Sequence, residues 1–268
     1  MTRILLIGGG HTHVVALRHI ARRQPAGLDI HLISPDSSTS YSGLLPGHIA
    51  GHWPRHTLEI PPPPLCRTAG TTLHATRVTA LDPVAQTVDF ASGDMLSFDY
   101  ASLDIGAMAE VSGPESLRKL GVPVKPLGPF ADRWSAFVSQ VETGKLPPHA
   151  AVLGAGTAGV ELALSMKYRL DKLGLSRPVH VSLIERGTDL LPGGNASMRA
   201  LLQRELNRAG VAIFTGETVA DADESGLRLA SREDVPAGFV ALATGARPQA
   251  WLTGTGLTLH DGFVSVGQ

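Results

Sequence analysis

Gly154-Ala155-Gly156-Thr157-Ala158-Gly159 is the stretch of sequence that decides the fold. An apolar run at 151–153 precedes it, a helical pattern follows it to about Leu173, and a second apolar run occupies 179–185. Strand, glycine turn, helix and strand in this order form the βαβ unit that opens a dinucleotide-binding fold. The first glycine permits a tight turn, the second lets backbone amides approach a pyrophosphate, and the third brings the helix close to the strand. The stretch therefore predicts a nucleotide site, with a glycine turn that merely packs as the alternative.

Glu185 ends the second apolar run of this unit. An acidic side chain there accepts hydrogen bonds from the ribose 2′- and 3′-hydroxyls and repels a 2′-phosphate. We therefore expect the unit to prefer NAD(H) over NADP(H), with the neighbouring Arg186 weakening that preference slightly.

A less regular copy of the same unit opens the chain. An apolar run at 4–7 leads into Gly8-Gly9-Gly10, a helical pattern follows to about Arg23, and a second run occupies 29–34. The recurrence of the unit predicts an α/β fold with two Rossmann-like dinucleotide-binding domains.

The first turn departs from the fingerprint at two places. His13 stands where the third glycine belongs, and Ser34 stands where an acidic residue would end the second strand, with Asp36 two residues later. Either Ser34 or Asp36 can meet a ribose hydroxyl. His11 and His13 lie in the turn itself, where a cation would assist phosphate binding, but imidazole is mostly neutral at pH 7. A packing role for His13 is an equal alternative.

The region between the two units alternates apolar and polar residues and contains turn residues. Runs at 72–81, 87–90 and 94–105 predict three strands of a β-meander inserted between the two halves. The prolines at 61–64 predict a surface connection rather than a helix, and the Pro- and Gly-spaced segment 113–129 predicts a linker.

Composition narrows the function classes. Of the 268 residues, 23 are Lys or Arg and 24 are Asp or Glu, so no cationic excess is present to neutralise nucleic-acid phosphates. The single cysteine, Cys66, excludes a disulfide framework and a redox-active cysteine pair within the chain, and it favours a reducing, cytoplasmic location. Neither a signal peptide nor a transmembrane segment is expected, because no apolar run approaches 18 residues.

No metal site is expected. His48, His52 and His56 recur at helical spacing, but Gly51 and Pro54 interrupt any helix there. Since no cysteine or carboxylate completes a ligand set, these histidines are interpreted as loop residues. The same reasoning treats Cys66, which has no partner, as a spectator.

The chain resembles the flavoproteins of the pyridine nucleotide-disulfide oxidoreductase superfamily, nearer their type II NADH dehydrogenase-like branch. The segments that carry this resemblance are 7–13, Tyr41-Ser42-Gly43-Leu44-Leu45-Pro46-Gly47, Phe98-Asp99-Tyr100, 154–161 and Ala243-Thr244-Gly245-Ala246-Arg247-Pro248. The first two segments together also resemble a module that some bacteria fuse to selenophosphate synthetase.

The resemblance implies two cofactors, FAD and NAD(H), and divides the chain into three domain segments. Residues 1–112 would form the first part of an FAD-binding domain, 113–245 an NAD(H)-binding domain, and 246–268 a return to the FAD-binding domain. Leu45 and Pro46 would lie close to the flavin, Val78 would offer backbone contacts to the adenine, and Glu161 would lie near the nicotinamide as the candidate catalytic side chain. The implied FAD-binding residues are Gly8, Gly9, Gly10, His11, Ser34, Leu45, Pro46, Val78 and Gly106, and the implied NAD(H)-binding residues are Gly154, Gly156, Thr157, Gly159, Glu185 and Gly245.

Three departures from the family pattern are visible. An Ala-Thr-Gly turn closes each domain junction in such families; Ala243-Thr244-Gly245 keeps it, whereas Asp104-Ile105-Gly106 keeps only the glycine. One cysteine cannot supply the pair that disulfide reductases of the superfamily use. A late Gly-Asp pair that would contact FAD is not found, so the resemblance implies that the C-terminal part of the fold is missing and the chain truncated.

These observations favour an FAD-dependent oxidoreductase that takes hydride from NAD(P)H, with NADH preferred, and passes electrons to a small-molecule acceptor, a quinone or another compound. The alternatives are a non-catalytic nucleotide-binding module, sensing redox state or serving a partner in selenium metabolism, and a protein that binds NAD(H) alone. A functional link to selenophosphate synthetase and assembly as a homodimer both stay open.

Overall fold

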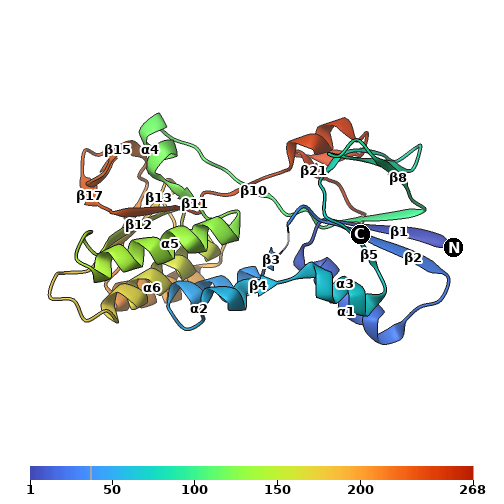
Figure 1. Cartoon of the computed structure of the whole chain (residues 1–268). Coiled ribbons are helices and arrows are strands. Elements are labelled where there is room, and N and C mark those ends of the chain that lie inside the picture. The colour runs from blue at the N-terminus through green and yellow to red at the C-terminus, as the bar shows by residue number, and fades with distance from the viewer. Residues whose placement is uncertain (37, 268) are drawn as a thin grey trace. The chain divides into compact units, whose positions relative to one another are not determined.

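The computed structural model describes residues 1–36 and 38–267, and it divides the chain into two compact units. The first unit comprises Met1–Tyr41, Glu59–Met108 and Arg247–Gln268, and the second comprises Ser42–Leu58 and Ala109–Ala246. The elements of both units can be followed in Figure 1. Each unit is described by itself.

A four-stranded parallel sheet forms the centre of the first unit, in the order β5-β2-β1-β9. Its strands are β1 (Thr2–Ile7), β2 (Leu28–Ile33), β5 (Thr72–His74) and β9 (Tyr100–Leu103). Because successive side chains of a strand point to opposite faces, Leu5 and Leu6 pack in different apolar clusters.

Helices cover one face of this sheet and a small antiparallel sheet covers the other. Leu6 and Leu32 meet Leu17 of α1 (His11–Arg23) and Cys66 of α3 (Pro62–Ala69). On the opposite face, Leu5 and neighbouring strand residues pack against the meander of β6 (Val78–Asp82), β7 (Thr87–Phe90) and β8 (Met95–Ser97).

The meander exists, but two of its predicted strands are each divided. The run 72–81 contains β5, which joins the parallel sheet, and β6, which joins the meander, while the run 94–105 is divided between β8 and β9 in the same way. A chain that leaves one sheet for another keeps its alternating pattern, so the sequence alone does not mark the crossing.

The predicted surface connection at 61–64 is wrong. Pro61 is the N-cap of α3 and Pro62 is its first residue. Proline is tolerated at the first turn of a helix, because the N–H that it lacks has no intrahelical partner at that place.

The second unit is built around a five-stranded parallel sheet in the order β11-β18-β12-β13-β14. Its strands are β11 (Val122–Pro123), β12 (His149–Leu153), β13 (His180–Glu185), β14 (Ala212–Thr215) and β18 (Phe239–Leu242).

Both faces of this sheet are buried as well. One face packs against apolar side chains of α2 (Leu45–Ile49), α5 (Leu127–Glu142), α6 (Thr157–Asp171) and α7 (Ala196–Ala209). The other packs against α4 (Glu115–Leu120) and a second antiparallel sheet of β15 (Val219–Asp223), β16 (Gly226–Leu229) and β17 (Asp234–Pro236).

Two segments differ from their predicted places. Residues 42–58, which the sequence assigns to the first domain, belong to the second unit, because Leu45 and Ile49 bury their side chains in its core and Trp134 Nε1 donates a 3.0 Å hydrogen bond to the Ile49 carbonyl. The predicted linker 113–129 contains α4 and the start of α5, both amphipathic helices that proline and glycine residues flank.

The remaining elements are short. They are β3 (Thr39–Ser40), β4 (Glu59–Ile60), β10 (Met108–Ala109), β19 (Ala246–Arg247), β20 (Leu259–His260), β21 (Phe263–Val264) and the 3₁₀ turns η1 (Ser42–Leu44), η2 (Arg55–Leu58) and η3 (Ala250–Gly254).

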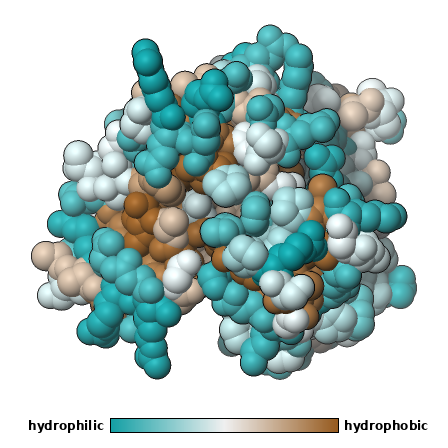
Figure 2. Space-filling model, turned by 90° about the vertical axis from the view of Figure 1, so that its left-hand side faces the viewer, coloured by the Kyte–Doolittle hydropathy of each residue, from teal (hydrophilic) through white to brown (hydrophobic). Residues whose placement is uncertain are grey.

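The predicted α/β class with two Rossmann-like units is confirmed. Polar residues dominate the face drawn in Figure 2, with apolar residues visible between them. No helix among the described residues is long and apolar enough to cross a membrane.

Candidate functional site

The glycine turn of the second unit connects β12 to α6. Gly154 has φ +97°, and a Cβ there would overlap the carbonyl oxygen of Ala243. A Cβ at Gly159 would overlap the carbonyl oxygen of Gly154, so the helix approaches the strand at backbone distance. Both positions therefore require glycine, for the reasons that the fingerprint predicts.

The middle glycine of this turn faces open space. Nothing lies within 4 Å of where a Cβ of Gly156 would stand. Gly156 is also the N-cap of α6, whose first turn contains no acidic residue and begins with the exposed Thr157. The N–H groups at a helix start have no intrahelical partners and carry the positive end of the helix dipole, so this space suits an anionic group.

Glu185 lies at the carboxyl end of β13, beside this turn. One carboxylate oxygen accepts a 2.7 Å hydrogen bond from the Ala155 N–H, and the other accepts a 2.8 Å bond from the Gly187 N–H. The side chain is buried, which fixes its direction. Since each carboxylate oxygen has two lone pairs, both keep capacity for a further donor such as a ribose hydroxyl.

A hollow of about 300 Å³ opens near Glu185, at the next strand of the sheet. Thr215, which pairs with Glu185 in the ladder, lines it, together with Asp189 and Arg199. Arg199 Nη1 lies 3.9 Å from Asp189 Oδ2. The sequence did not predict this arginine, because only the fold brings α7 to the loop that follows β13.

The first glycine turn repeats the backbone of the second. Gly8 also has φ +97°, and a Cβ there would overlap the carbonyl oxygen of Asp104, just as one at Gly154 would overlap that of Ala243. The Asp104 N–H donates to Ile7 over 2.8 Å, and the Ala243 N–H donates to Leu153 over the same distance. Asp104 and Ala243 therefore occupy equivalent places.

Side chains make the two turns different. His13 replaces the third glycine; it is buried, with Nδ1 2.7 Å from the Gly8 carbonyl oxygen and Nε2 2.9 Å from Ser102 Oγ. This geometry gives His13 the packing role that the sequence left open. Beside it, the Asp104 carboxylate accepts a 3.2 Å hydrogen bond from the His13 N–H and covers Gly10, whose Cβ would overlap it.

The other predicted FAD-binding residues lie in both units. Ser34, which follows β2, is buried with Oγ 2.8 Å from the position of a Gly9 Cβ, and Val78 is the first residue of β6. His11 stacks on Tyr41 with ring centroids 4.5 Å apart, which joins two of the segments that carry the family resemblance. Gly106, with φ +65°, is exposed.

Leu45 and Pro46 lie in α2 of the second unit, where Leu45 is 4% exposed and its side chain packs in the core. Glu161 is an exposed residue of α6, and Gly245, with φ +113°, follows Thr244, whose hydroxyl donates to the Glu110 carbonyl. The roles given to these residues stay predictions.

His48, expected in a loop, is instead a buried residue of α2 whose Nδ1 lies 2.9 Å from the Trp53 carbonyl oxygen. Among the described residues no group of three His, Cys, Asp or Glu side chains is placed to hold a metal ion.

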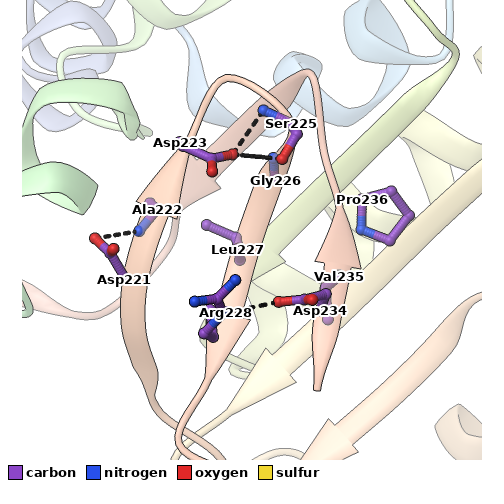
Figure 3. Close-up of a pocket in the computed structure, with 10 residues that line it drawn as sticks. All are labelled: Asp221, Ala222, Asp223, Ser225, Gly226, Leu227, Arg228, Asp234, Val235 and Pro236. Carbon is purple, nitrogen blue, oxygen red and sulfur yellow. Dashed lines mark hydrogen bonds and ion pairs between the residues drawn. The ribbon is translucent and has the colours of Figure 1, made fainter. Parts of the chain in front are cut away.

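An open hollow of about 320 Å³ lies on the second unit's antiparallel sheet, and none of the predicted site residues lines it (Figure 3). Its acidic side chains are already paired: Asp223 accepts from Ser225, and Asp234 accepts a 3.0 Å bond from Arg228. Hydrogen bonds from Ser116 and Ser225 lower the pKa of Asp221 and Asp223 respectively. The hollow is therefore an ordinary exposed hairpin surface.

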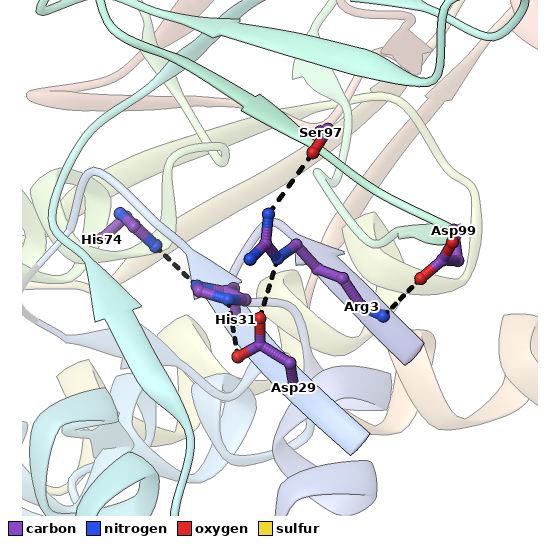
Figure 4. Close-up of polar contacts among 6 residues, drawn as sticks. All are labelled: Arg3, Asp29, His31, His74, Ser97 and Asp99. Atoms are coloured by element: carbon purple, nitrogen blue, oxygen red, sulfur yellow. Dashed lines mark hydrogen bonds and ion pairs between the residues drawn. The ribbon is translucent and has the colours of Figure 1, made fainter. Parts of the chain in front are cut away.

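A row of polar side chains that the sequence did not predict crosses the meander-facing side of the first unit's sheet (Figure 4). Arg3 Nε donates to Asp29 over 2.8 Å, Asp29 lies 3.0 Å from His31 Nε2, and His31 Nδ1 lies 2.8 Å from His74 Nε2. The hydrogen bond from Arg3 lowers the pKa of Asp29, and burial lowers that of His74. Alternate residues of β1 and β2 share a face, so the pattern predicts this row only once the register is known.

The residues at the two turns can be tested against the cofactors that the sequence implies. The second turn, with its open space, uncapped helix start and buried carboxylate, fits a dinucleotide. The backbone of the first turn fits a pyrophosphate, but the Asp104 carboxylate lies beside Gly10 and would repel that group.

Comparison with known proteins gives the family. Residues 2–268 match the protein family described as pyridine nucleotide-disulphide oxidoreductase. A probable mitochondrial NADH-ubiquinone oxidoreductase of Schizosaccharomyces pombe is 24% identical over 287 aligned residues, which cover 91% of this chain and 51% of that protein. The chain thus spans about half the length of this relative.

Solved structures share the fold. The sulfide:quinone oxidoreductase of Aquifex aeolicus is similar with a TM-score of 0.79 at 19% identity, covering 96% of this chain and 61% of that one. NDH2 of Plasmodium falciparum, solved in complex with NADH, is similar with a TM-score of 0.76 at 18% identity, covering 95% and 57%. With a family match over almost its whole length, the chain belongs to the pyridine nucleotide-disulphide oxidoreductase family.

Proposed function

We propose that the chain is the nucleotide-binding part of an FAD-dependent oxidoreductase that takes hydride from NAD(P)H, prefers NADH and delivers electrons to a small-molecule acceptor. The observation that carries the proposal is the pair of equivalent glycine turns, one in each unit, with matching φ angles at Gly8 and Gly154. Family membership and the NADH-linked names of several relatives support it.

In the second unit, the turn at 154–159 would bind the NAD(H) pyrophosphate. The open side of Gly156 leaves room for the phosphates, and the N-terminus of α6 attracts their charge. Glu185 would accept the ribose hydroxyls, which favours NADH because a 2′-phosphate would meet its negative charge at close range. Glu161, on the exposed side of the same helix, would lie near the nicotinamide.

In the first unit, the turn at Gly8, Gly9 and Gly10 would hold the FAD pyrophosphate, with Ser34 near the ribose and the Val78 backbone near the adenine. The chemistry that the two cofactors supply when bound is hydride transfer from the reduced nicotinamide to the flavin. The residues of this chain bind and orient the cofactors, and the acceptor that we propose is a quinone or a compound of similar size, as in relatives whose names include ubiquinone and demethylphylloquinone.

A second candidate is a nucleotide-binding module without turnover, which binds NAD(H) and serves a partner. The specific observation in its favour is the Asp104 carboxylate at the first turn, where FAD would need to bind.

The test uses the 268-residue chain incubated with excess FAD and passed through a desalting column. We expect a yellow protein whose absorbance near 450 nm disappears on anaerobic addition of NADH and, more slowly, of NADPH. Addition of a soluble quinone should restore the absorbance. A chain that binds NADH but emerges colourless would contradict the oxidoreductase and support the module.

A further inference from the structure

The two glycine turns differ most at one position. The residue that follows the strand beside each turn is Asp104 in the first unit and Ala243 in the second, and both use their backbone in the same way. Their side chains are what differ: a methyl group in one turn and a carboxylate in the other.

The Asp104 carboxylate occupies a place in the first turn whose counterpart in the second turn is empty. A Cβ on Gly10 would overlap the Asp104 carboxyl group, whereas nothing lies within 4 Å of the corresponding position at Gly156. Asp104 therefore places a negative charge on the side of the first turn where a pyrophosphate would approach the backbone.

The carboxylate is also held weakly. Among residues 1–36 and 38–267, the carboxylate accepts one hydrogen bond, of 3.2 Å from the His13 N–H, and no cation pairs with it. Asp104 is only partly buried. A rotation about its side-chain bonds would remove it from the turn while the backbone bonds at Gly10 and Ile7 stay in place.

We propose that Asp104 determines how strongly the first turn binds FAD. Its carboxylate competes with the FAD pyrophosphate for the N-terminus of α1, so that FAD binds only by displacing this carboxylate. The proposal rests on the function proposed above for the first turn. It makes FAD binding weaker than the backbone alone would allow, and it makes the second turn, with Ala243, the stronger anion site of the chain.

The test is Asp104→Asn, which keeps the shape of the side chain and an oxygen that accepts from His13 but removes the charge. The control is Asp89→Asn, which removes the same charge from an exposed residue of β7 in the same unit. FAD affinity is measured by quenching of flavin fluorescence, and far-UV circular dichroism checks the fold of each variant. We expect Asp104→Asn to bind FAD about tenfold or more tightly than the wild type, since like charges a few ångströms apart repel strongly at a partly buried site. Asp89→Asn should bind like the wild type.

The reciprocal variant, Ala243→Asp, transfers the carboxylate to the second turn. We expect NADH to bind about tenfold or more weakly to this variant than to the wild type. This measurement keeps the charge argument testable if Asp104→Asn fails to fold, because unchanged NADH affinity in Ala243→Asp would overturn it.

The outcomes separate this proposal from the function on which it rests. FAD binding of equal strength in the wild type and Asp104→Asn overturns the proposal and leaves the oxidoreductase standing. Binding by Asp104→Asn but not by the wild type supports the role of Asp104 and, because the wild type then holds no FAD, favours the nucleotide-binding module over the oxidoreductase. Failure of every variant to bind FAD, with NADH binding retained, contradicts the function proposed for the first turn, and the role of Asp104 with it.

Discussion

Glu185 combines a structural contact with a predicted binding role. Its two carboxylate oxygens accept the N–H groups of Ala155, in the nucleotide turn, and of Gly187, in the loop that follows β13. A buried acceptor of this kind positions the turn before any ligand arrives, so the same side chain affects both stability and nucleotide affinity.

Replacing Glu185 by Ala should therefore have two effects. The free energy of unfolding should fall by about 1–3 kcal/mol, because the buried N–H of Ala155 and the partly buried N–H of Gly187 lose their acceptor. NADH affinity should fall about tenfold or more, and the ratio of NADPH to NADH affinity should rise, because the repulsion of a 2′-phosphate disappears. Urea denaturation and fluorescence titration measure these quantities. An unchanged NADPH to NADH ratio would leave Glu185 a purely structural residue.

The sequence predicts the backbone of the second turn well, because Gly154 and Gly159 each have a backbone reason that motif spacing reveals. It predicts less of the first turn. His13 is visible as a departure, but its bonds to Gly8 and Ser102 depend on the width of the gap between α1 and β1. Asp104 is visible only as an unusual junction residue, since the direction of a side chain is not encoded in spacing.

At the scale of elements, α2 shows how a motif segment is anchored. Trp134 of α5 is 2% exposed, and its indole N–H donates to the carbonyl oxygen of Ile49 at the end of α2. The aromatic ring also lies edge-on to Phe239 of β18, with ring centroids 5.3 Å apart. The segment that the family resemblance places near the flavin is thus bound to the core of the second unit.

Trp134→Phe should lower the free energy of unfolding by about 1–3 kcal/mol, because the buried Ile49 carbonyl loses its donor and the smaller ring leaves space. Trp53→Phe is the matched control, since Trp53 is 48% exposed and its replacement should change stability little. Equilibrium unfolding in urea compares the two. Equal effects would show that the indole hydrogen bond contributes nothing.

The sequence predicts elements well where a single sheet determines the pattern and less well where two sheets share a run. Both glycine turns and their helices have the expected boundaries within about two residues. The divided strands in 72–81 and 94–105 differ from the prediction because alternation is the same in both sheets. Helix α3 was missed because three of its first residues are prolines, which only the first turn of a helix accepts.

Across the whole molecule, histidines link stability to pH. Burial, and then the neighbouring His31, lower the pKa of His74 in the first unit, and burial, then His180 and Arg177, lower that of His149 in the second. A histidine whose folded pKa is lowered binds fewer protons in the folded chain than in the unfolded chain at pH values below about 6.5. Both units are therefore expected to lose stability as the pH falls from 7.5 to 5.5.

His74→Gln should reduce that loss. The glutamine keeps a donor for the contact with His31 but has no proton to gain, so the difference in unfolding free energy between pH 7.5 and pH 5.5 should be smaller than in the wild type. Urea denaturation at the two pH values measures it. His149 still contributes to the dependence in the variant, and an identical loss in the variant and the wild type would show that His74 takes no part.

The one cysteine of the chain lies in helix α3 of the first unit, 2% exposed, and burial raises the pKa of its thiol. A thiol reagent can therefore attack Cys66 only in molecules whose helix has opened, so the alkylation rate measures how often α3 opens. The ratio of this rate to that of an unfolded chain gives the free energy of local opening without any introduced label. A ligand that binds only the closed first unit lowers the alkylation rate in proportion to the fraction of molecules that it occupies. Excess FAD is therefore expected to slow alkylation of Cys66. An unchanged rate would show that FAD does not bind the first unit.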